Sequence, residues 1–203
     1  MRMTHTQNHS RHHQGYTLIE VLIAVVILSI GLLGMAGIQL KGMRGTQNSF
    51  LRTEAANLAN SMAERMHANP SAAQNSDSTL DNQYESIDSA LADCATPPGK
   101  LCDQDNSGTA ITSCSISEMA TYDAFTWICG DGSQGGVKHA LPNGKATVTC
   151  IDNNTAVGDT DTCSPGSTHR ITVSWSESNP GADTDSTTND EVITQSISIN
   201  TVP

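Results

Sequence analysis

The stretch that decides the fold is Gln14-Gly15-Tyr16-Thr17-Leu18-Ile19-Glu20, followed by Val21-Leu22-Ile23-Ala24-Val25-Val26-Ile27-Leu28. A short polar leader ends in glycine, and an apolar run with a single carboxylate, Glu20, begins at once. The next charge is Lys41, so residues 21–40 form a run of 20 uncharged residues. A helix of that length spans roughly 30 Å, the thickness of the hydrocarbon core of a bilayer. The sequence therefore predicts a transmembrane helix over residues 16–40.

The position of Gly15 separates this segment from an ordinary secretory signal, whose small-residue cleavage site follows the apolar region. Here the small residue comes first, so cleavage after Gly15 would remove residues 1–15 and leave the apolar helix on the mature chain. The new α-amine would be at Tyr16, four residues before Glu20. A carboxylate in a spanning helix is costly without a partner. We expect Glu20 to pair with the Tyr16 amine of a neighbouring subunit; the alternative is a plain anchor with Glu20 near the lipid headgroups.

Composition narrows the classes of partner. The chain has 203 residues and a net charge of −11, and loss of the leader arginines Arg2 and Arg11 would make it −13. Such an acidic surface repels nucleic-acid phosphates, so we expect no nucleic-acid partner. Aromatic residues make up only 3% of the chain, which leaves few large side chains for a hydrophobic core.

The cysteines compensate for that shortage. All six follow the apolar segment, at Cys94, Cys102, Cys114, Cys129, Cys150 and Cys163. An even number in an exported domain with a poor core predicts disulfides, and it places the domain outside the cytoplasm with the helix N-terminus inside. Six cysteines allow 15 pairings. We favour Cys150 with Cys163 for one bridge and leave the other four to share two bridges. No C-x-x-C pair occurs, which disfavours zinc.

Beyond the membrane segment, an apolar stripe indicates that the helix continues as an amphipathic helix over residues 41–68. The stripe recurs at steps of three and four residues, as in one face of a helix, and consists of Leu51, Ala55, Leu58, Met62 and Met66. Asn69-Pro70 is expected to end the helix, because proline disfavours helical geometry in the preceding residue. Residues 69–203 are then predicted to form a disulfide-rich globular domain.

Within that domain the pattern predicts both helices and strands. In chain order the expected elements are a short helix marked by Leu80, Tyr84, Ile87 and Leu91; a helix over 119–128 behind a capping box of Ser115 and Glu118; a hairpin at Asn143-Gly144 between 137–141 and 145–151; and strands over 170–176 and 191–199. A long helix followed by an antiparallel sheet is an α+β arrangement.

The stretch from Gly15 to Ala24 resembles the class III signal of type IV prepilins and type II secretion pseudopilins. This resemblance implies that a membrane prepilin peptidase cuts between Gly15 and Tyr16 and N-methylates Tyr16. It also implies that Glu20 guides docking into a growing filament. The usual first mature residue is phenylalanine, so Tyr16 is a departure from the pattern.

Later motifs are similar to those of the PilV family of type IV pilus modification minor pilins. They are Ser29-Ile30-Gly31-Leu32-Leu33-Gly34-Met35-Ala36, Ala63-Glu64-Arg65-Met66-His67-Ala68-Asn69-Pro70, Glu118-Met119-Ala120-Thr121-Tyr122-Asp123 with Trp127, Leu141-Pro142-Asn143-Gly144, and Ile171-Thr172-Val173-Ser174-Trp175. Asn143, where glycine is common, and the insert from Cys150 to Cys163 depart from the family. The resemblance implies a type IV pilin-like fold, with the long helix packed on a small antiparallel sheet and disulfide-stapled loops.

The function implied is that of a minor pilin, present at low copy in type IV pili, that supports pilus assembly or priming, adhesion or twitching motility. The alternatives are an adhesin-type binding module at the pilus tip and a type II secretion pseudopilin. Expected partners are the prepilin peptidase, other major and minor pilins, the inner-membrane assembly machinery, and the membrane before assembly. The protein would span the inner membrane once, with its C-terminal domain in the periplasm, and then enter the surface pilus.

No enzyme is expected, since the sequence has neither a Gly-rich phosphate loop nor a nucleophile motif in a suitable context. We therefore assign no catalytic residue, no cofactor and no metal. Asp103-Gln104-Asp105-Asn106-Ser107-Gly108 begins like a calcium loop. An EF-hand needs a bidentate glutamate at the twelfth position, where this chain has Cys114.

Overall fold

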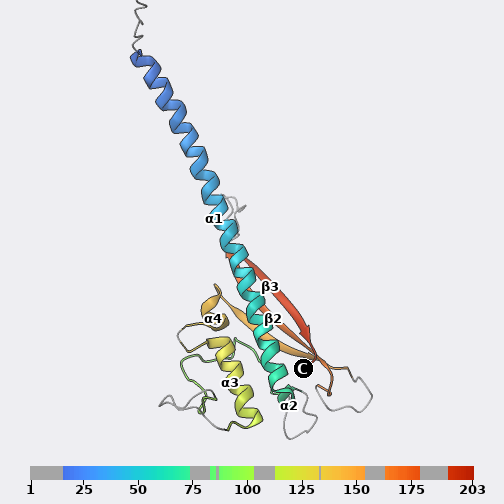
Figure 1. The fold of residues 1–203 in the computed structure, drawn as a ribbon. Helices are drawn as coiled ribbons and strands as arrows, with labels where there is room; N and C mark the ends of the chain where they lie inside the picture. Colours follow the sequence, from blue (N-terminus) through green and yellow to red (C-terminus); the bar gives the residue numbers. More distant parts are fainter. Residues whose placement is uncertain are drawn as a thin grey trace, which may run out of the picture. The chain divides into compact units, whose positions relative to one another are not determined.

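The computed structural model describes residues 16–73, 83–85, 87–102, 113–132, 134–153, 163–178 and 192–203. The chain divides into two compact units, residues 1–43 and 44–203, which are described separately below. Helix α1 (Leu18–Ala68) supplies residues to both units (Figure 1). The calcium-like loop from Asp103 and the predicted cleavage residue Gly15 lie outside the described residues.

Helix α1 confirms the long predicted helix, with one correction to its buried stripe. In the second unit its buried residues are Leu51, Ala55, Ala59, Met62 and Met66. Ala59 therefore takes the place predicted for Leu58, and because both stripes have the same mean step, periodicity does not distinguish them. Leu58 is only partly buried at the border of the core. The helix ends at Ala68, in agreement with the end predicted at Asn69-Pro70. Pro70 is the first residue of the short helix α2 (Pro70–Ala73), a position at which proline is well tolerated.

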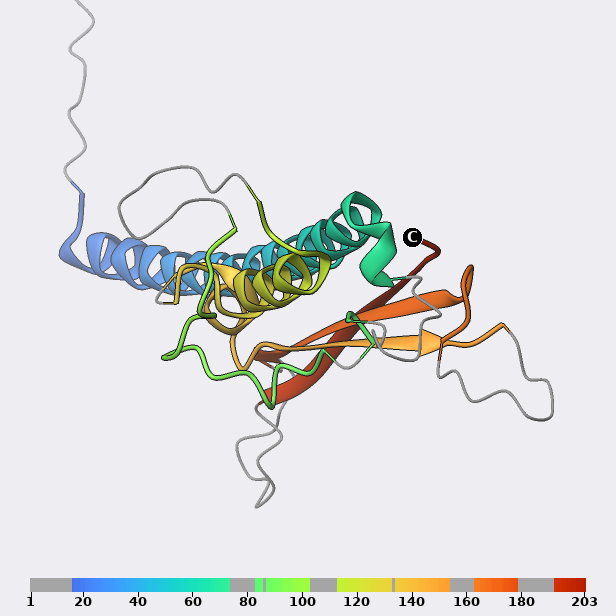
Figure 2. The same cartoon turned by 90° about the horizontal axis from the view of Figure 1, so that it is seen from below.

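The strands form one antiparallel sheet in the order β1 (Lys145–Ile151), β2 (Thr168–Ser178) and β3 (Val192–Thr201). The two strands predicted from alternation, over 170–176 and 191–199, correspond to β2 and β3. The inner face of the sheet buries Ala146, Val148, Ile171, Val173 and Trp175. Within the second unit, the helices lie on one face of this sheet (Figure 2). The fold is α+β, as predicted.

Helix α3 (Ile116–Cys129) begins with the predicted capping box. The Glu118 N–H donates to Ser115 Oγ at 3.2 Å, and the Ser115 N–H donates to Glu118 Oε2 at 2.8 Å. This backbone N–H, followed by the Lys100 ammonium at 3.0 Å, lowers the pKa of Glu118 to about 2. The helix then buries Ala120, Trp127 and Ile128 in the core.

The predicted hairpin at Asn143-Gly144 is wrong, although its second strand, predicted over 145–151, is confirmed as β1. Residues Gly136–Ala140 form a short helix, α4, and β1 pairs with β2 instead. Gly135 and Gly136 both adopt positive φ, which allows the chain to turn into α4 and bury Val137. Asn143 does occupy the left-handed region, with φ of 50°, and leads directly into β1. The Asn-Gly signal thus marks a real turn between a helix and a strand.

The short helix predicted around Leu80 to Leu91 is also wrong over the described residues. The chain forms turns here and then bridges to β1, with Asp88 opposite Thr147. Tyr84 and Ile87 are buried as expected of apolar anchors, but Leu91 is 84% exposed. A short helix is only marginally stable by itself, and the backbone of β1 offers this segment hydrogen bonds that a helix would forgo. Leu80 lies outside the described residues.

Candidate functional site

The N-terminal end of α1 presents the two predicted processing and assembly residues that the structure describes. Tyr16 is 83% exposed, and Glu20 is an exposed residue in the first turn. The Thr17 carbonyl accepts the N–H groups of Glu20 at 3.1 Å and Val21 at 3.3 Å. A carboxylate in the first turn is favoured by the partial positive charge of a helix N-terminus. Glu20 therefore has a stabilised position on the helix, and its side chain is accessible to a second subunit.

The N-terminal part of α1 exposes an almost purely apolar surface. Large side chains from Leu18 to Leu40 are each more than half exposed, and Glu20 is the one charged residue among residues 16–40. By length and composition, α1 is the one helix among the described residues that is apolar enough to cross a membrane. Burying a fully exposed leucine or isoleucine contributes roughly 1.5–3 kcal/mol. A bilayer or other apolar helices would stabilise this surface by covering it.

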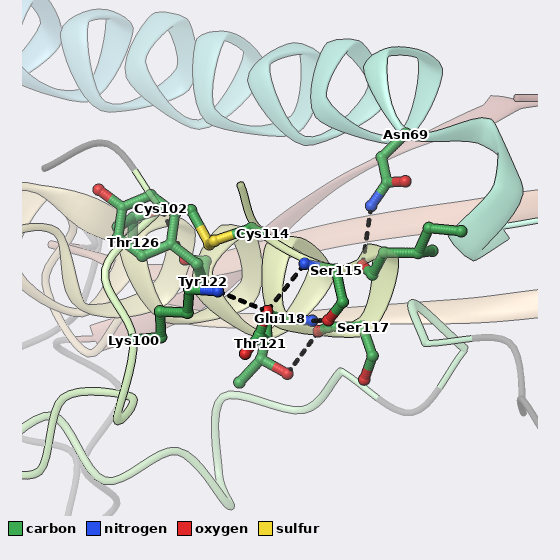
Figure 3. The surroundings of a disulfide bond; sticks show 11 residues. Asn69, Lys100, Cys102, Cys114, Ser115, Ser117, Glu118, Thr121, Tyr122 and Thr126 are labelled. Atoms are coloured by element: carbon green, nitrogen blue, oxygen red, sulfur yellow. Dashed lines mark hydrogen bonds and ion pairs between the residues drawn. A yellow bond between two sulfur atoms is a disulfide. The ribbon is translucent and has the colours of Figure 1, made fainter. Parts of the chain in front are cut away.

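All six cysteines are paired in disulfides, so the predicted disulfide set is confirmed. The bridges are Cys94–Cys129, Cys102–Cys114 and Cys150–Cys163, with Cα–Cα distances of 5.3, 5.9 and 5.8 Å. The pair we favoured from spacing, Cys150 with Cys163, is among them. Figure 3 shows Cys102–Cys114 directly before the capping box of α3. Close by, the Asn69 side-chain amide at the end of α1 donates to the Ile116 carbonyl at 3.1 Å.

A buried polar junction links α1 to α3. Arg65 Nη1 donates to Asp123 Oδ1 at 3.0 Å and to Thr126 Oγ1 at 2.8 Å. The Tyr84 hydroxyl donates to Asp123 Oδ2 at 2.7 Å. Burial, followed by the hydrogen bond to Asp123, raises the pKa of Tyr84. Arg65 and Asp123 belong to two separate stretches that carry the family resemblance, and this contact joins them.

Sequence reasoning missed this junction, and it also missed a second one near the end of β2. Glu177 is buried, accepts the Trp175 indole N–H at 3.0 Å, and pairs with Arg52 of α1 at 3.3 Å. A carboxylate beside a tryptophan on a strand was the available signal, because a buried charge requires a cation and hydrogen-bond donors. The partner could not be read from the sequence, since Arg52 lies 125 residues away.

Among the described residues, one cluster and one hollow bear on metal and catalytic chemistry. Cys150, Cys163 and His169 gather within 4.8 Å, but both sulfurs are in a disulfide and so supply no thiolate ligand. Burial lowers the pKa of His169. On the outer face of the sheet is a hollow of about 460 Å³. Its described lining consists of Ser89, Ala90, Lys138, Asn143, Gly144, Lys145, Ser174, Ser176 and Thr194. These residues provide hydrogen-bonding groups without a carboxylate or histidine for acid–base work.

Comparison with known proteins gives two adjoining matches. Residues 37–125 match the family described as Type IV pilin Tt1218, and residues 10–36 match the prokaryotic N-terminal methylation motif. No curated protein and no solved structure was found to match the chain. The methylation motif includes Gly15, Tyr16 and Glu20, and the pilin match extends through the Arg65–Asp123 junction. The two family-model matches support a type IV pilin, and the long N-terminal helix, antiparallel sheet and three disulfides agree with them.

Proposed function

We propose that the protein is a minor pilin of the PilV kind, present at low copy in type IV pili, where it supports pilus assembly or priming, adhesion or twitching motility. One observation carries the proposal. The exposed apolar segment of α1 has Glu20 as its one charge and belongs to the same helix whose later residues pack in a compact, disulfide-bonded domain. A subunit built this way needs an apolar environment for one part and an aqueous one for the other.

In this proposal a prepilin peptidase cuts after Gly15 and methylates Tyr16. The subunit first spans the inner membrane once, with its N-terminus in the cytoplasm and its domain in the periplasm. On assembly, its apolar helix leaves the lipid for the helices of other major and minor pilins. Glu20 then pairs with the Tyr16 amine of a neighbour, since a carboxylate inside an apolar bundle requires a cationic partner.

Intact-mass analysis of the protein from its native host tests the processing step. We expect the loss of residues 1–15 and the gain of one methyl group at Tyr16. A Gly15→Asp variant is the matched control and should stay uncut, because a large charged residue replaces the small one at the cleavage site. An uncut wild-type chain in cells with an active prepilin peptidase would contradict the proposal.

Gene deletion separates the roles within this proposal. Surface pili, twitching and adhesion are scored independently, with the wild-type gene restored as the control. Loss of pili indicates a role in assembly or priming. Normal pili that no longer adhere would favour an adhesin-type binding module at the tip. Normal pili with impaired protein secretion would favour the pseudopilin alternative.

A further inference from the structure

The outer edge of β3 has no partner among the described residues. In the order β1-β2-β3, β3 is an edge strand that pairs with β2 over its whole length, from Val192 opposite Ser178 to Thr201 opposite His169 (Figure 1). No backbone hydrogen bond from the described chain reaches the other side of β3. In an antiparallel strand every second residue turns its N–H and C=O toward the next strand position. β3 therefore presents a row of donors and acceptors that a further strand could satisfy.

The opposite edge of the sheet is covered at Ala146–Val148. Residues 87–89 run beside β1, where the Ser89 N–H donates to the Ala146 carbonyl at 2.9 Å. The Val148 N–H donates to the Ile87 carbonyl at 3.0 Å, and Asp88 forms a bridge with Thr147. Among the described residues, the chain thus covers part of one edge and pairs with nothing at the other.

The sequence of β3 lacks the usual protection of an edge strand. Edge strands are generally short, or they carry charges, prolines or bulges that prevent pairing with another chain. β3 has 10 residues, and Val-Ile-Thr-Gln-Ser-Ile-Ser-Ile-Asn-Thr contains no charge, proline or glycine.

The apolar side chains of β3 are also incompletely covered. On the neighbouring strand β2, Ile171 and Val173 are fully buried. Their partners on β3, Ile199 and Ile197, pack against the same core but remain partly exposed, as does Ile193. A strand added beyond β3 would extend the inner face and cover these isoleucines. It would need apolar side chains on that face and small polar ones beside Thr194, Ser196 and Ser198.

We propose that β3 is a docking edge for an extended, uncharged strand donated by a different protein of the pilus, which adds a fourth strand to the sheet. This inference rests on the proposed function, because it places both chains in one filament or its assembly complex. Main-chain hydrogen bonds would supply most of the affinity, and the alternating side chains of the partner would supply specificity. Since β3 has no charge, binding should be insensitive to salt.

Symmetry argues against a second copy of this chain as the occupant. An antiparallel pair of β3 strands requires a two-fold axis normal to the sheet. Residues 44–68 of α1 lie along the face of the sheet (Figures 1 and 2), so this axis would reverse their direction in the second copy. The two Arg44 ends would then point in opposite directions. Copies anchored in one membrane need both ends toward that membrane, because Arg44 is only four residues from the apolar segment.

A head-to-tail arrangement of copies meets a different obstacle. In that case β3 of one copy would have to pair with β1 of the next, and residues 87–89 already occupy that edge. Both arrangements of identical subunits are thereby disfavoured. A strand from a different chain avoids both problems.

Amide hydrogen exchange, resolved to single residues, is the direct test. The full chain is compared in two states, inserted in the membrane of a host that lacks the other pilus components and assembled in pili from the native host. We expect every second amide of β3 to exchange at least about tenfold more slowly in the assembled state, as for amides that enter a strand ladder. Amides of β1 are the matched control and should not change. Uniform slowing along β3, or no slowing, would overturn the inference.

A photo-crosslinking residue in place of Ser196 identifies the occupant, with the same replacement at Thr149 on β1 as the control. An adduct at position 196 with a segment of another pilus protein whose own amides show alternating protection supports the inference. An adduct with a second copy of this chain, or with another segment of the same copy, overturns it. If the subunit is absent from pili, the proposed function itself fails. If it is present in pili but β3 is unprotected, only the docking edge is wrong.

A pair of proline variants gives an independent measure. In Gln195→Pro and Ser196→Pro, one proline removes an N–H bonded to β2 and the other removes an N–H that points outward. The variant that keeps a melting temperature near the wild-type value identifies the outward position. That variant should be processed and folded, but with the photo-crosslinking residue placed at Ser198 instead of Ser196, its adduct should be at least about tenfold depleted. Undiminished adduct formation in it would overturn the inference.

Discussion

At the scale of single residues, the chain has an acidic surface and also buries several polar side chains. His169, Glu177, Asp123 and Ser89 are all buried. Three of them have partners that offset the cost of burial: Glu177 has Arg52 and Trp175, Asp123 has Arg65 and Tyr84, and Ser89 Oγ accepts the Ala146 N–H at 2.8 Å. His169 also has a contact, with Cys163 Sγ 3.6 Å from its Nε2, and burial disfavours its charged form.

Acidification should weaken the domain through His169. Burial lowers the pKa of His169 below its ordinary value of about 6.5, although the Ser167 backbone and the charge of Glu85 oppose the shift. As the pH falls, His169 therefore binds a proton in the unfolded chain before it does so in the folded domain. The contribution of neutral His169 to stability is complete above about pH 6.5 and declines as the pH falls below that value. We expect the melting temperature to fall between pH 7 and pH 5, and to fall less in His169→Gln. An equal decline in both proteins would show that other groups are responsible.

At the scale of elements, sequence patterns predicted the helices and strands whose formation depends mainly on neighbouring residues. Twenty uncharged residues and Pro70 define α1 and its end, and alternation defines β2 and β3. The helix expected near Tyr84 does not form, because residues 87–89 bind the edge of β1 instead. The sequence around Tyr84 alone does not reveal this competing interaction.

The polar contacts of the candidate site could not be predicted for the same reason. Arg65 and Asp123 are 58 residues apart, and Arg52 and Glu177 are 125 apart. The spacing of cysteines did identify Cys150 with Cys163, because a separation of 13 positions allows a short loop to close. It could not decide between the pairings of the other four. The N-terminal signal was recognisable because its meaning depends on the order of adjacent residues and needs no tertiary contact.

The junction between α1 and α3 should depend on Asp123. Replacing it with alanine leaves the Arg65 guanidinium and the buried Tyr84 hydroxyl without their shared acceptor. We expect Asp123→Ala to lower the free energy of unfolding by about 1–3 kcal/mol. Glu64→Ala removes the same charge from an exposed position on α1 and should change it by less than about 0.5 kcal/mol. Chemical denaturation of both variants measures the difference; similar losses would mean that net charge, and not the junction, matters.

The three disulfides should contribute unequally. Cys94–Cys129 joins residues 35 apart and fixes the end of α3, whereas Cys102–Cys114 joins residues 12 apart. In the chain-entropy description these loops correspond to about 4 and about 3 kcal/mol. The double variant Cys94→Ala/Cys129→Ala should therefore melt at a lower temperature than Cys102→Ala/Cys114→Ala. An equal or reversed order would show that strain or packing outweighs loop length.

At the scale of the whole molecule, the chain combines one unit with an apolar surface and another with an acidic, disulfide-bonded surface. The first unit has no core of its own among the described residues, since every residue from 16 to 43 is exposed. It gains stability only from what surrounds it, lipid or other helices. The second unit has a continuous core built on Met62, Met66, Trp127 and Ile171. In the proposed function, transfer from membrane to filament changes the surroundings of one unit and leaves the core of the other intact.

A substitution at Glu20 tests this proposed transfer. Glu20→Val removes a costly charge from the spanning helix, so membrane insertion and processing should be no worse than in the wild type. It also removes the proposed partner of the Tyr16 amine, and a pairing worth about 1.4 kcal/mol corresponds to about tenfold lower incorporation into pili. Ser29→Val, a substitution in the same exposed apolar segment that leaves the charge unchanged, should be incorporated normally. Quantitative immunoblots of membrane and pilus fractions give both values. Equal incorporation of Glu20→Val and the wild type would mean that the carboxylate is dispensable for assembly, and that the first turn of α1 carries it only as a helix-stabilising charge.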